Sequence, residues 1–206
     1  MQSESSRARM RTYRDRRYRK LDQRIVHGIE ARIINRFLDR VVQPGDAFLD
    51  MPVGYGRFLG DLMRRSDRVI GSDHQLAMLE LSRETHGNEL PVTCNDCAAL
   101  PFADDSFDVV TCIRLFQHLH DPAMRARTFA EIARVTRRNA IVTTYLESPL
   151  HQWLHHKRKL KRLTYHTDAS LQQDLGQAGL RLVAAKRSIP GLHAQYIMLL
   201  EKSRTA

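Results

Sequence analysis

Short apolar segments alternate with longer amphipathic segments between residues 45 and 145, and this pattern constrains the fold more than any other feature. Apolar runs bounded by polar residues and glycines are typical of buried strands. Strands that alternate with helices form βαβ units around a parallel sheet. The strands that we expect here span residues 47–51, 68–73, 90–95, 107–113 and 139–145.

Two more apolar segments, residues 180–186 and 194–201, bring the number of expected strands to seven. The stretches between strands repeat apolar residues at intervals of three and four, as amphipathic helices do. We expect helices at residues 21–40, 57–65, 74–84, 123–135 and 170–178. The apolar stripe of the first helix consists of Leu21, Ile25, Ile29, Ile33, Ile34 and Phe37.

The net charge of +10 is concentrated in two segments. Residues 1–40 hold 12 basic and 5 acidic side chains, and residues 151–166 hold 5 basic and no acidic ones. Clustered Lys and Arg attract anionic partners, although a charged helix face can also be simply solvated. We therefore divide the chain into a basic N-terminal arm and helix that acts as a lid, residues 1–44, and a domain of residues 45–206 with a basic lid insertion at 146–166.

The size and hydropathy of the chain bound its location. A chain of 206 residues with 42% hydrophobic residues buries about 70% of its unfolded surface, so its core needs neither metal nor disulfide. It contains no run of about 18 apolar residues that would span a membrane, and no apolar stretch follows the N-terminal charges to form a secretory signal. We expect a cytoplasmic protein, peripheral to the inner membrane surface.

Polar residues and glycines follow four successive expected strands. In a doubly wound sheet, ligands bind beyond the carboxyl ends of the strands. Gly54 and Gly56 let the backbone turn tightly after the first strand. Asp73 follows about 20 residues later, where a carboxylate can accept hydrogen bonds from two ribose hydroxyls. Residues 95–97 and 114–118 follow the next two strands, so we expect one ligand site at this edge.

Three segments resemble motifs of the class I S-adenosylmethionine-dependent methyltransferases that act on small molecules. Residues 50–56 are similar to the family pattern Asp-x-Gly-x-Gly-x-Gly, with Pro52 in place of the first glycine. Residues 96–108 match the family segment Asp-x-x-x-Leu-Pro-Phe-x-Asp-x-Ser-Phe-Asp. Residues 131–135 resemble the helix before the family's fifth strand. The resemblance covers about residues 45–145.

The resemblance implies a Rossmann-like α/β fold. Its sheet is doubly wound, mostly parallel and seven-stranded, with helices on both faces and a terminal antiparallel hairpin that the last two expected strands match. A dinucleotide-binding oxidoreductase is the competing interpretation of the glycine turn. It is disfavoured because the third glycine of Gly-x-Gly-x-x-Gly is missing.

The resemblance also implies S-adenosylmethionine as the cofactor and S-adenosylhomocysteine as its product. Asp50 would reach the amino group of the methionine part, directly or through water. Gly54 and Gly56 would let the backbone pass against the cofactor. Pro52 fixes φ at about −65° and removes one N–H donor, so we expect binding to survive this departure.

The adenosine part of the cofactor is assigned to the following two strand ends by the same resemblance. Asp73 would hold the ribose hydroxyls, and His74 or Met78 would pack beside the adenine. Asp96 would accept a hydrogen bond from the adenine amino group, with the Cys97 N–H nearby.

The segment after the fourth strand supplies two more predicted site residues. The Arg114 carbonyl would accept the remaining amino proton. His118 lies where a general base could face the methyl group. An ordinary histidine titrates at about pH 6.5, which suits that role. The alternative is a histidine packed at a strand-to-helix junction. We expect no metal, because Cys94 and Cys97 have the spacing of half a zinc site and a second pair is missing.

The acceptor is predicted from charge. The Asn/Asp-Pro-Pro-Tyr element that serves exocyclic base amines is absent after the fourth strand, which disfavours a nucleic-acid base. Residues 150–163 form a basic amphipathic stretch that could lie on an anionic membrane, close over a phosphorylated acceptor, or merely pack as a solvated lid. Our hypothesis is methyl transfer to an oxygen, less readily a nitrogen, of an anionic small molecule or of a phosphorylated glycolipid or lipopolysaccharide-type sugar.

The N-terminal arm allows other interpretations. Its arginines, between Arg7 and Lys20, are interleaved with Tyr13 and Tyr18, and such residues contact phosphates and stack on bases. The alternative function is a methyltransferase-fold regulatory protein that binds a signalling nucleotide or RNA through this arm. A third interpretation makes the arm a cofactor lid, in which Tyr13 or one of Arg14, Arg16 and Arg17 clasps the methionine carboxylate.

Overall fold

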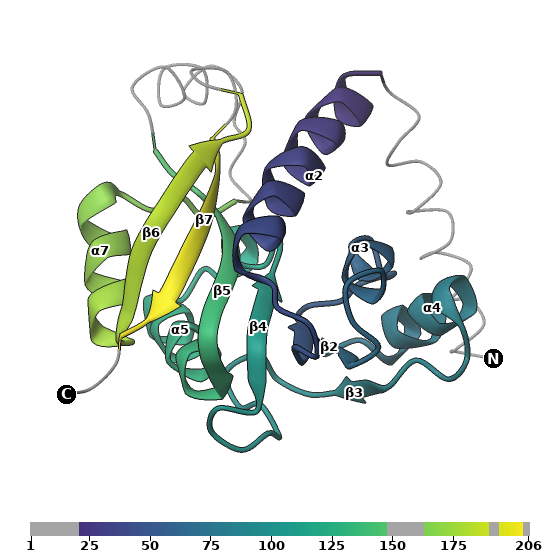
Figure 1. The fold of residues 1–206 in the computed structure, drawn as a ribbon. Helices are drawn as coiled ribbons and strands as arrows, with labels where there is room; N and C mark the ends of the chain where they lie inside the picture. The colour runs from purple at the N-terminus through teal and green to yellow at the C-terminus, as the bar shows by residue number, and fades with distance from the viewer. Residues whose placement is uncertain (1–20, 148–162, 190–193, 204–206) are drawn as a thin grey trace.

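A computed structural model describes residues 21–147, 163–189 and 194–203, and the rest of the chain lies outside the described residues. Seven strands form one sheet in the order β3-β2-β1-β4-β5-β7-β6 (Figure 1). All neighbours are parallel except β7, which is antiparallel to β5 and β6. The strands are β1 (Phe48–Asp50), β2 (Val69–Asp73), β3 (Val92–Cys94), β4 (Phe107–Cys112), β5 (Thr136–Tyr145), β6 (Leu180–Arg187) and β7 (Gln195–Lys202). The predicted fold class is confirmed.

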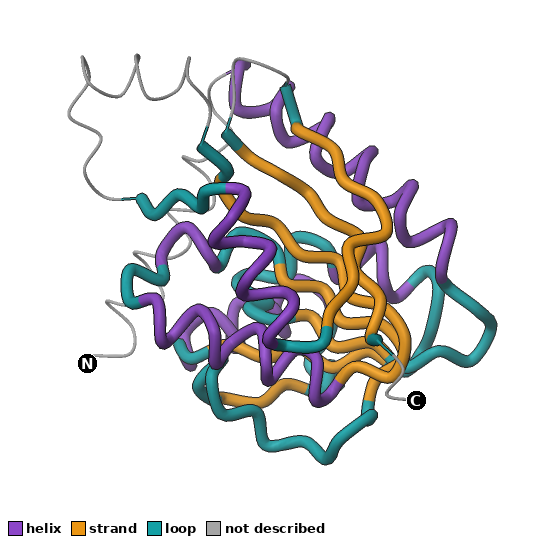
Figure 2. The backbone as a smooth tube through the Cα atoms, turned by 90° about the vertical axis from the view of Figure 1, so that its left-hand side faces the viewer, coloured by secondary structure: helices purple, strands orange, loops and turns teal. Residues whose placement is uncertain are grey.

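Helices cover both faces of this sheet, as Figure 2 shows. One layer holds α2, α3 and α4, and the other holds α5 and α7. Their bounds are α2 (Leu21–Val41), α3 (Leu59–Met63), α4 (Leu76–His86), α5 (Pro122–Val135) and α7 (Asp168–Gln177), with a short 3₁₀ helix η1 (Phe116–His118) after β4. Each helix that the sequence predicts is present, with ends shifted by a few residues.

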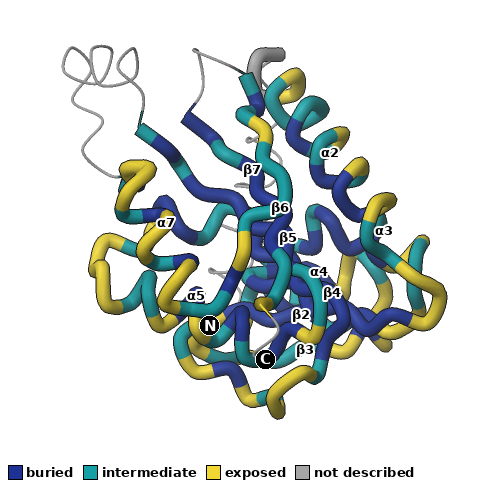
Figure 3. Tube along the Cα trace, turned by 60° about the vertical axis from the view of Figure 1, so that its left-hand side comes forward, coloured by how far each residue is buried: buried dark blue, intermediate teal, exposed yellow. Residues whose placement is uncertain are grey.

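The two helix layers bury alternate residues of the central strands. Phe48 and Val109 pack toward α2, α3 and α4, whereas the next residues, Leu49 and Val110, pack toward α5 and α7. Successive side chains of a strand point to opposite faces, so a strand that is apolar throughout needs cover on both sides. Figure 3 shows the resulting buried centre of the sheet.

The second half of α2 is part of the core. Ile34, Phe37 and Leu38 are buried against the sheet. Ile25, which the predicted stripe also includes, is 53% exposed, so the stripe is wrong at this position. The boundary predicted at residue 44 remains a prediction, but a helix with this packing is anchored to the domain.

The arm at residues 1–20 and most of the insertion predicted at residues 146–166 lie outside the described residues. The chain returns beside the end of β5 and η1: Leu146 forms a β-bridge with His166, and the Thr164 N–H donates to the Gln117 carbonyl at 2.9 Å. Within the described ranges, none of the helices has the length and hydropathy needed to span a membrane.

Candidate functional site

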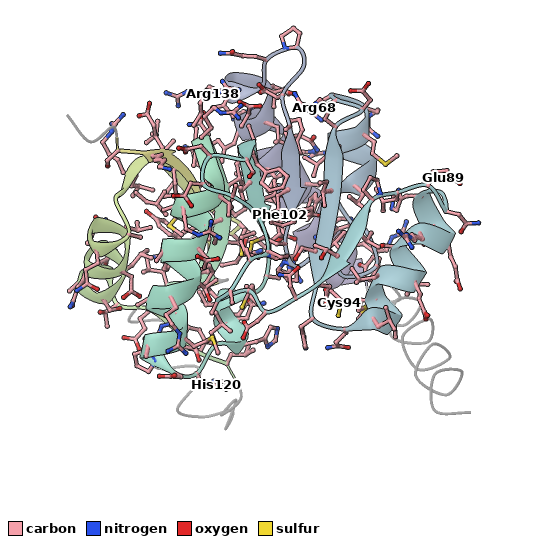
Figure 4. The ribbon with its side chains drawn as sticks, turned by 90° about the horizontal axis from the view of Figure 1, so that it is seen from below. Arg68, Glu89, Cys94, Phe102, His120 and Arg138 are labelled. Atoms are coloured by element: carbon pink, nitrogen blue, oxygen red, sulfur yellow. The ribbon has the colours of Figure 1, made fainter. Side chains whose placement is uncertain are left out.

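The strand register brings the predicted site residues to one edge of the sheet. Asp50 of β1 is paired with Gly71 of β2 and with Thr111 of β4, and Asp73 at the end of β2 is paired with Cys94 at the end of β3. In Figure 4, Cys94 and His120 lie on one side of the molecule, whereas Arg68 and Arg138, which precede or begin strands, lie on the opposite side.

Two adjoining cavities open at this carboxyl-terminal edge. The larger has a volume of about 550 Å³ and the smaller a volume of about 400 Å³. Their walls share Pro52, Asp73, His74, Leu115 and His118. Because the two cavities have five lining residues in common, they form one elongated site.

Nearly all predicted site residues line these cavities. Asp96 and Cys97 line only the larger cavity. The predicted residues that line only the smaller cavity are Asp50, Gly54, Met78 and Arg114. Gly56 lines neither. A Cβ on Gly56 would lie 2.5 Å from the His86 ring and 2.8 Å from Leu59, and its φ of +83° favours glycine. The structure therefore explains Gly56 by the turn and its close packing, and the binding roles of the other residues remain predictions.

Asp73 organises the glycine turn. Its Oδ2 accepts the Gly54 N–H at 3.0 Å, and its Oδ1 accepts the Gln75 N–H at 2.9 Å at the start of α4. A carboxylate has about four lone-pair positions, so two backbone donors leave it able to accept further hydrogen bonds. Held in this way, the carboxylate suits a pair of neighbouring hydroxyls.

Asp50 is a buried carboxyl group in the wall of the smaller cavity. Thr111 Oγ1 donates to its Oδ1 at 2.7 Å. Burial raises the pKa of Asp50 to about 7, because the ionised form is poorly solvated. A cationic group bound beside Asp50 would favour its ionised form, as the amino group of the cofactor would.

Of the residues predicted to lie near the adenine, His74, Asp96 and Cys97 line the larger cavity, whereas Met78 lines only the smaller one. Asp96 is exposed, and its Oδ1 accepts the Ala98 N–H at 2.9 Å in a tight turn. Burial raises the pKa of the Cys97 thiol, whose Sγ lies 3.6 Å from Thr128 Oγ1, and a raised pKa disfavours the thiolate form. The His74 side chain is 69% exposed at the mouth of both cavities. Within the described residues, no cluster of three metal-ligating side chains occurs.

Arg114 adopts a left-handed conformation after β4, with φ of +62°. Its N–H donates to Thr143 Oγ1 at 2.7 Å, and its carbonyl accepts from Gln117 Nε2 at 2.8 Å. These bonds fix the turn that leads into η1, where His118 lines both cavities. The carbonyl predicted to bind the cofactor thus already accepts one hydrogen bond, and a carbonyl oxygen can accept two.

Sequence reasoning missed two charged residues next to the site. Arg57 lines the smaller cavity. Glu30 of α2 is fully buried and contacts both Arg57 and Arg114. The sequence does contain a signal for Glu30: it is a single acid one helical turn before Ile33 and Ile34, on the face of the helix that packs into the core. An acid in such a position is normally paired with a basic residue.

Part of this chain is similar to a family of known proteins. A family described as a methyltransferase domain matches residues 49–144, which include the glycine turn and the ends of β1 to β4. The region that matches a methyltransferase domain makes up slightly less than half of this chain.

Several relatives of the matched region have names that refer to a quinone. The demethylmenaquinone methyltransferase of Thermobifida fusca is 35% identical over 97 residues, 45% of this chain and 40% of that protein. The ubiquinone biosynthesis O-methyltransferase of Hahella chejuensis is 35% identical over 104 residues, 48% of this chain and 43% of that protein. The matched part therefore spans about two fifths of these relatives.

Solved structures share the fold of the whole methyltransferase domain. The magnesium protoporphyrin IX methyltransferase of Synechocystis, solved with bound S-adenosylhomocysteine, has a TM-score of 0.76 at 18% identity. The superposition covers 89% of this chain and 88% of that one. The residues of this site fit the same cofactor. Hydrogen-bond acceptors that suit an amine, a diol and an aromatic amino group line the two adjoining cavities.

Proposed function

We propose that this chain transfers the methyl group of S-adenosylmethionine to an oxygen of an anionic acceptor, such as a phosphorylated glycolipid or a lipopolysaccharide-type sugar. The observation that supports the transfer most strongly is the convergence of Asp50, Asp73 and Asp96 on the two adjoining cavities. Asp50 lines only the smaller cavity, Asp73 lines both and Asp96 lines only the larger one, and this order is that of the amino group, the ribose and the adenine along the cofactor.

Methyl transfer requires little of the protein beyond alignment of the reacting groups. When bound, the cofactor supplies a methyl group on a positively charged sulfur. Alignment of nucleophile and methyl group contributes several kcal/mol, about 7 or more in favourable cases. His118, in the common wall of both cavities, would accept the proton of a hydroxyl nucleophile. An oxygen acceptor is also in keeping with the relative named an O-methyltransferase.

An anionic acceptor is supported by the outer surface of α2. Arg24, Arg32, Arg36 and Arg40 are exposed along one ridge at multiples of four residues. In the part of the chain that the structure describes, no ion pair involves these four arginines. The ridge continues directly from the Arg-rich arm in the sequence, so both can attract the same anionic headgroup, presented free or at a membrane surface.

The test combines binding with transfer. The full chain is titrated with S-adenosylhomocysteine and then incubated with methyl-labelled S-adenosylmethionine and either a phosphorylated glycolipid or its dephosphorylated form. We expect label in the phosphorylated lipid only. A double variant, Arg32→Gln with Arg36→Gln, should weaken this preference, whereas Arg127→Gln, an exposed residue of α5 on the other face of the sheet, should not.

The same assay separates the regulatory alternative. Equal labelling of both lipids would exclude an anionic acceptor but keep the enzyme. Absence of any transfer, together with salt-dependent binding of RNA or a nucleotide through the arm, would favour the regulatory protein instead.

A further inference from the structure

The Glu30 carboxylate joins four parts of the structure beside the smaller cavity. Arg114 donates from Nε to Oε1 and from Nη2 to Oε2, both at 2.9 Å. Arg57 Nη2 contacts Oε2, and Gln195 Nε2 contacts Oε1. A carboxylate on α2 thus holds the glycine turn, the loop after β4 and the start of β7 together.

The paired arginines face the site, whereas Glu30 does not. Arg57 and Arg114 both line the smaller cavity, and Glu30 is fully buried behind them. Arg57 is fixed further: its Nε lies 3.0 Å from His27 Nδ1, and its guanidinium lies 4.9 Å from the centre of the Phe58 ring. Burial by itself would raise the pKa of Glu30, but Arg57 and Arg114 lower it, so the carboxylate is ionised at neutral pH.

The elongated site therefore has two ends of different chemistry. The larger cavity is lined by the acceptors Asn95 and Asp96, which suit hydroxyl and amino groups. The smaller cavity is lined by Arg57 and Arg114, whose side chains suit an anion, and by Asp50, which suits a cation. A ligand with a nucleoside at one end and a carboxylate at the other matches this arrangement.

We propose that Arg57 and Arg114 form a carboxylate-binding subsite for the amino-acid part of the cofactor, and that Glu30 is the positioning residue that holds both. This inference rests on the proposed function. Arginine binds carboxylates through paired, charge-assisted hydrogen bonds whose strength depends on the orientation of the guanidinium plane. Glu30 sets that orientation from behind, so it influences a ligand that it does not touch.

Two ligands that differ in the amino-acid part test the subsite. S-adenosylhomocysteine carries the carboxylate, and 5′-methylthioadenosine lacks the whole amino-acid part. In calorimetric titrations of the full chain, Arg57→Gln should weaken S-adenosylhomocysteine about tenfold to a hundredfold, the range for a lost charged hydrogen bond. Binding of 5′-methylthioadenosine should change less than about twofold, because both ligands use the same nucleoside contacts.

The matched control is Arg64→Gln. Arg64 follows α3, is 69% exposed, pairs with Asp61 and lines neither cavity. This variant should bind both ligands as the wild type does. Equal losses of both ligands in Arg57→Gln, or no loss of either, would overturn the subsite while the proposed function stands. If the wild type binds neither ligand, the proposed function itself fails.

Glu30→Gln tests the positioning role. The amide keeps the shape and one acceptor but loses the charge that holds two guanidinium groups. We expect weaker S-adenosylhomocysteine binding with 5′-methylthioadenosine unchanged, in a variant whose circular dichroism is that of the wild type. A purely structural role would change both affinities together and overturn the assignment. If this variant does not fold, the Arg57→Gln comparison decides the subsite alone.

Discussion

Asp73 accepts the backbone N–H of Gly54 at 3.0 Å, so the acid at the end of β2 and the glycine turn after β1 form one unit. The same carboxylate accepts the Gln75 N–H at the start of α4. Two neighbouring βα connections therefore depend on a single side chain, and the candidate site lies where they meet.

Asp73→Asn should lower the affinity for S-adenosylhomocysteine at least about tenfold. An amide offers one oxygen instead of two and turns an N–H₂ toward a backbone donor, so one contact is lost and one becomes repulsive. Calorimetric titration measures the effect. Asp67→Asn, an exposed acid before β2, is the control and should bind normally. Unchanged affinity in Asp73→Asn would show that this carboxylate does not reach the ligand.

Cofactor affinity should depend on the ionisation of Asp50. Its pKa of about 7 leaves the carboxyl mostly protonated at pH 6, and a bound ammonium favours the ionised form. S-adenosylhomocysteine should therefore bind about tenfold more tightly at pH 8 than at pH 6, since binding must release the proton at the lower pH. The affinity of Asp50→Asn should be flat over this range, and an equal pH dependence in both proteins would exclude Asp50 as the cause.

The raised pKa of Asp50 also predicts how the free energy of unfolding changes with pH. The pKa of Asp50 is raised above that of the unfolded chain, so the folded state holds the proton more strongly and the stabilisation is complete below pH 4. The contribution is lost as the pH rises to 7, about 4 kcal/mol for three pH units. Denaturant titrations of wild type and Asp50→Asn at pH 5 and pH 8 measure it. The difference between the two proteins should favour the wild type more at pH 5 than at pH 8.

Two glycines of the turn should respond differently to alanine. In Gly56→Ala the new Cβ meets His86 and Leu59 at a φ of +83°, so we expect a loss of about 3 kcal/mol in the free energy of unfolding. In Gly54→Ala no atom lies within 4 Å of the Cβ, and only the left-handed φ of +55° costs free energy, about 1 kcal/mol. Adding His86→Ala to Gly56→Ala should recover part of the loss. Equal losses in the two single variants would contradict this account.

His118→Ala should lower turnover about a hundredfold or more and leave cofactor affinity within about twofold, as loss of a general base does. The assay is methyl transfer to the phosphorylated glycolipid, alongside titration with S-adenosylhomocysteine. His120→Ala removes a nearby exposed histidine that lines neither cavity, and its turnover should stay normal. Normal turnover in His118→Ala would remove this residue from the reaction.

The elements and the edge of the sheet that holds the site could be predicted from local patterns. Strands such as Val69–Asp73 are recognised by apolar runs that end in a polar residue, and strand ends in a parallel sheet meet at one edge whatever lies between them. The function of Gly56 was harder to predict, because the turn motif does not show that His86, on another element, occupies the space beside it.

What the sequence by itself determined was periodicity and spacing: seven strands, the alternation of helices, and acids at successive strand ends. Only the tertiary structure decided which charges meet. Glu30 lies 84 residues from Arg114 and 165 from Gln195 in the chain, yet both of these residues contact its buried carboxylate. Local sequence determines local conformation, whereas a buried ion pair forms only after the sheet has brought distant segments together, because burial is what makes a partner necessary.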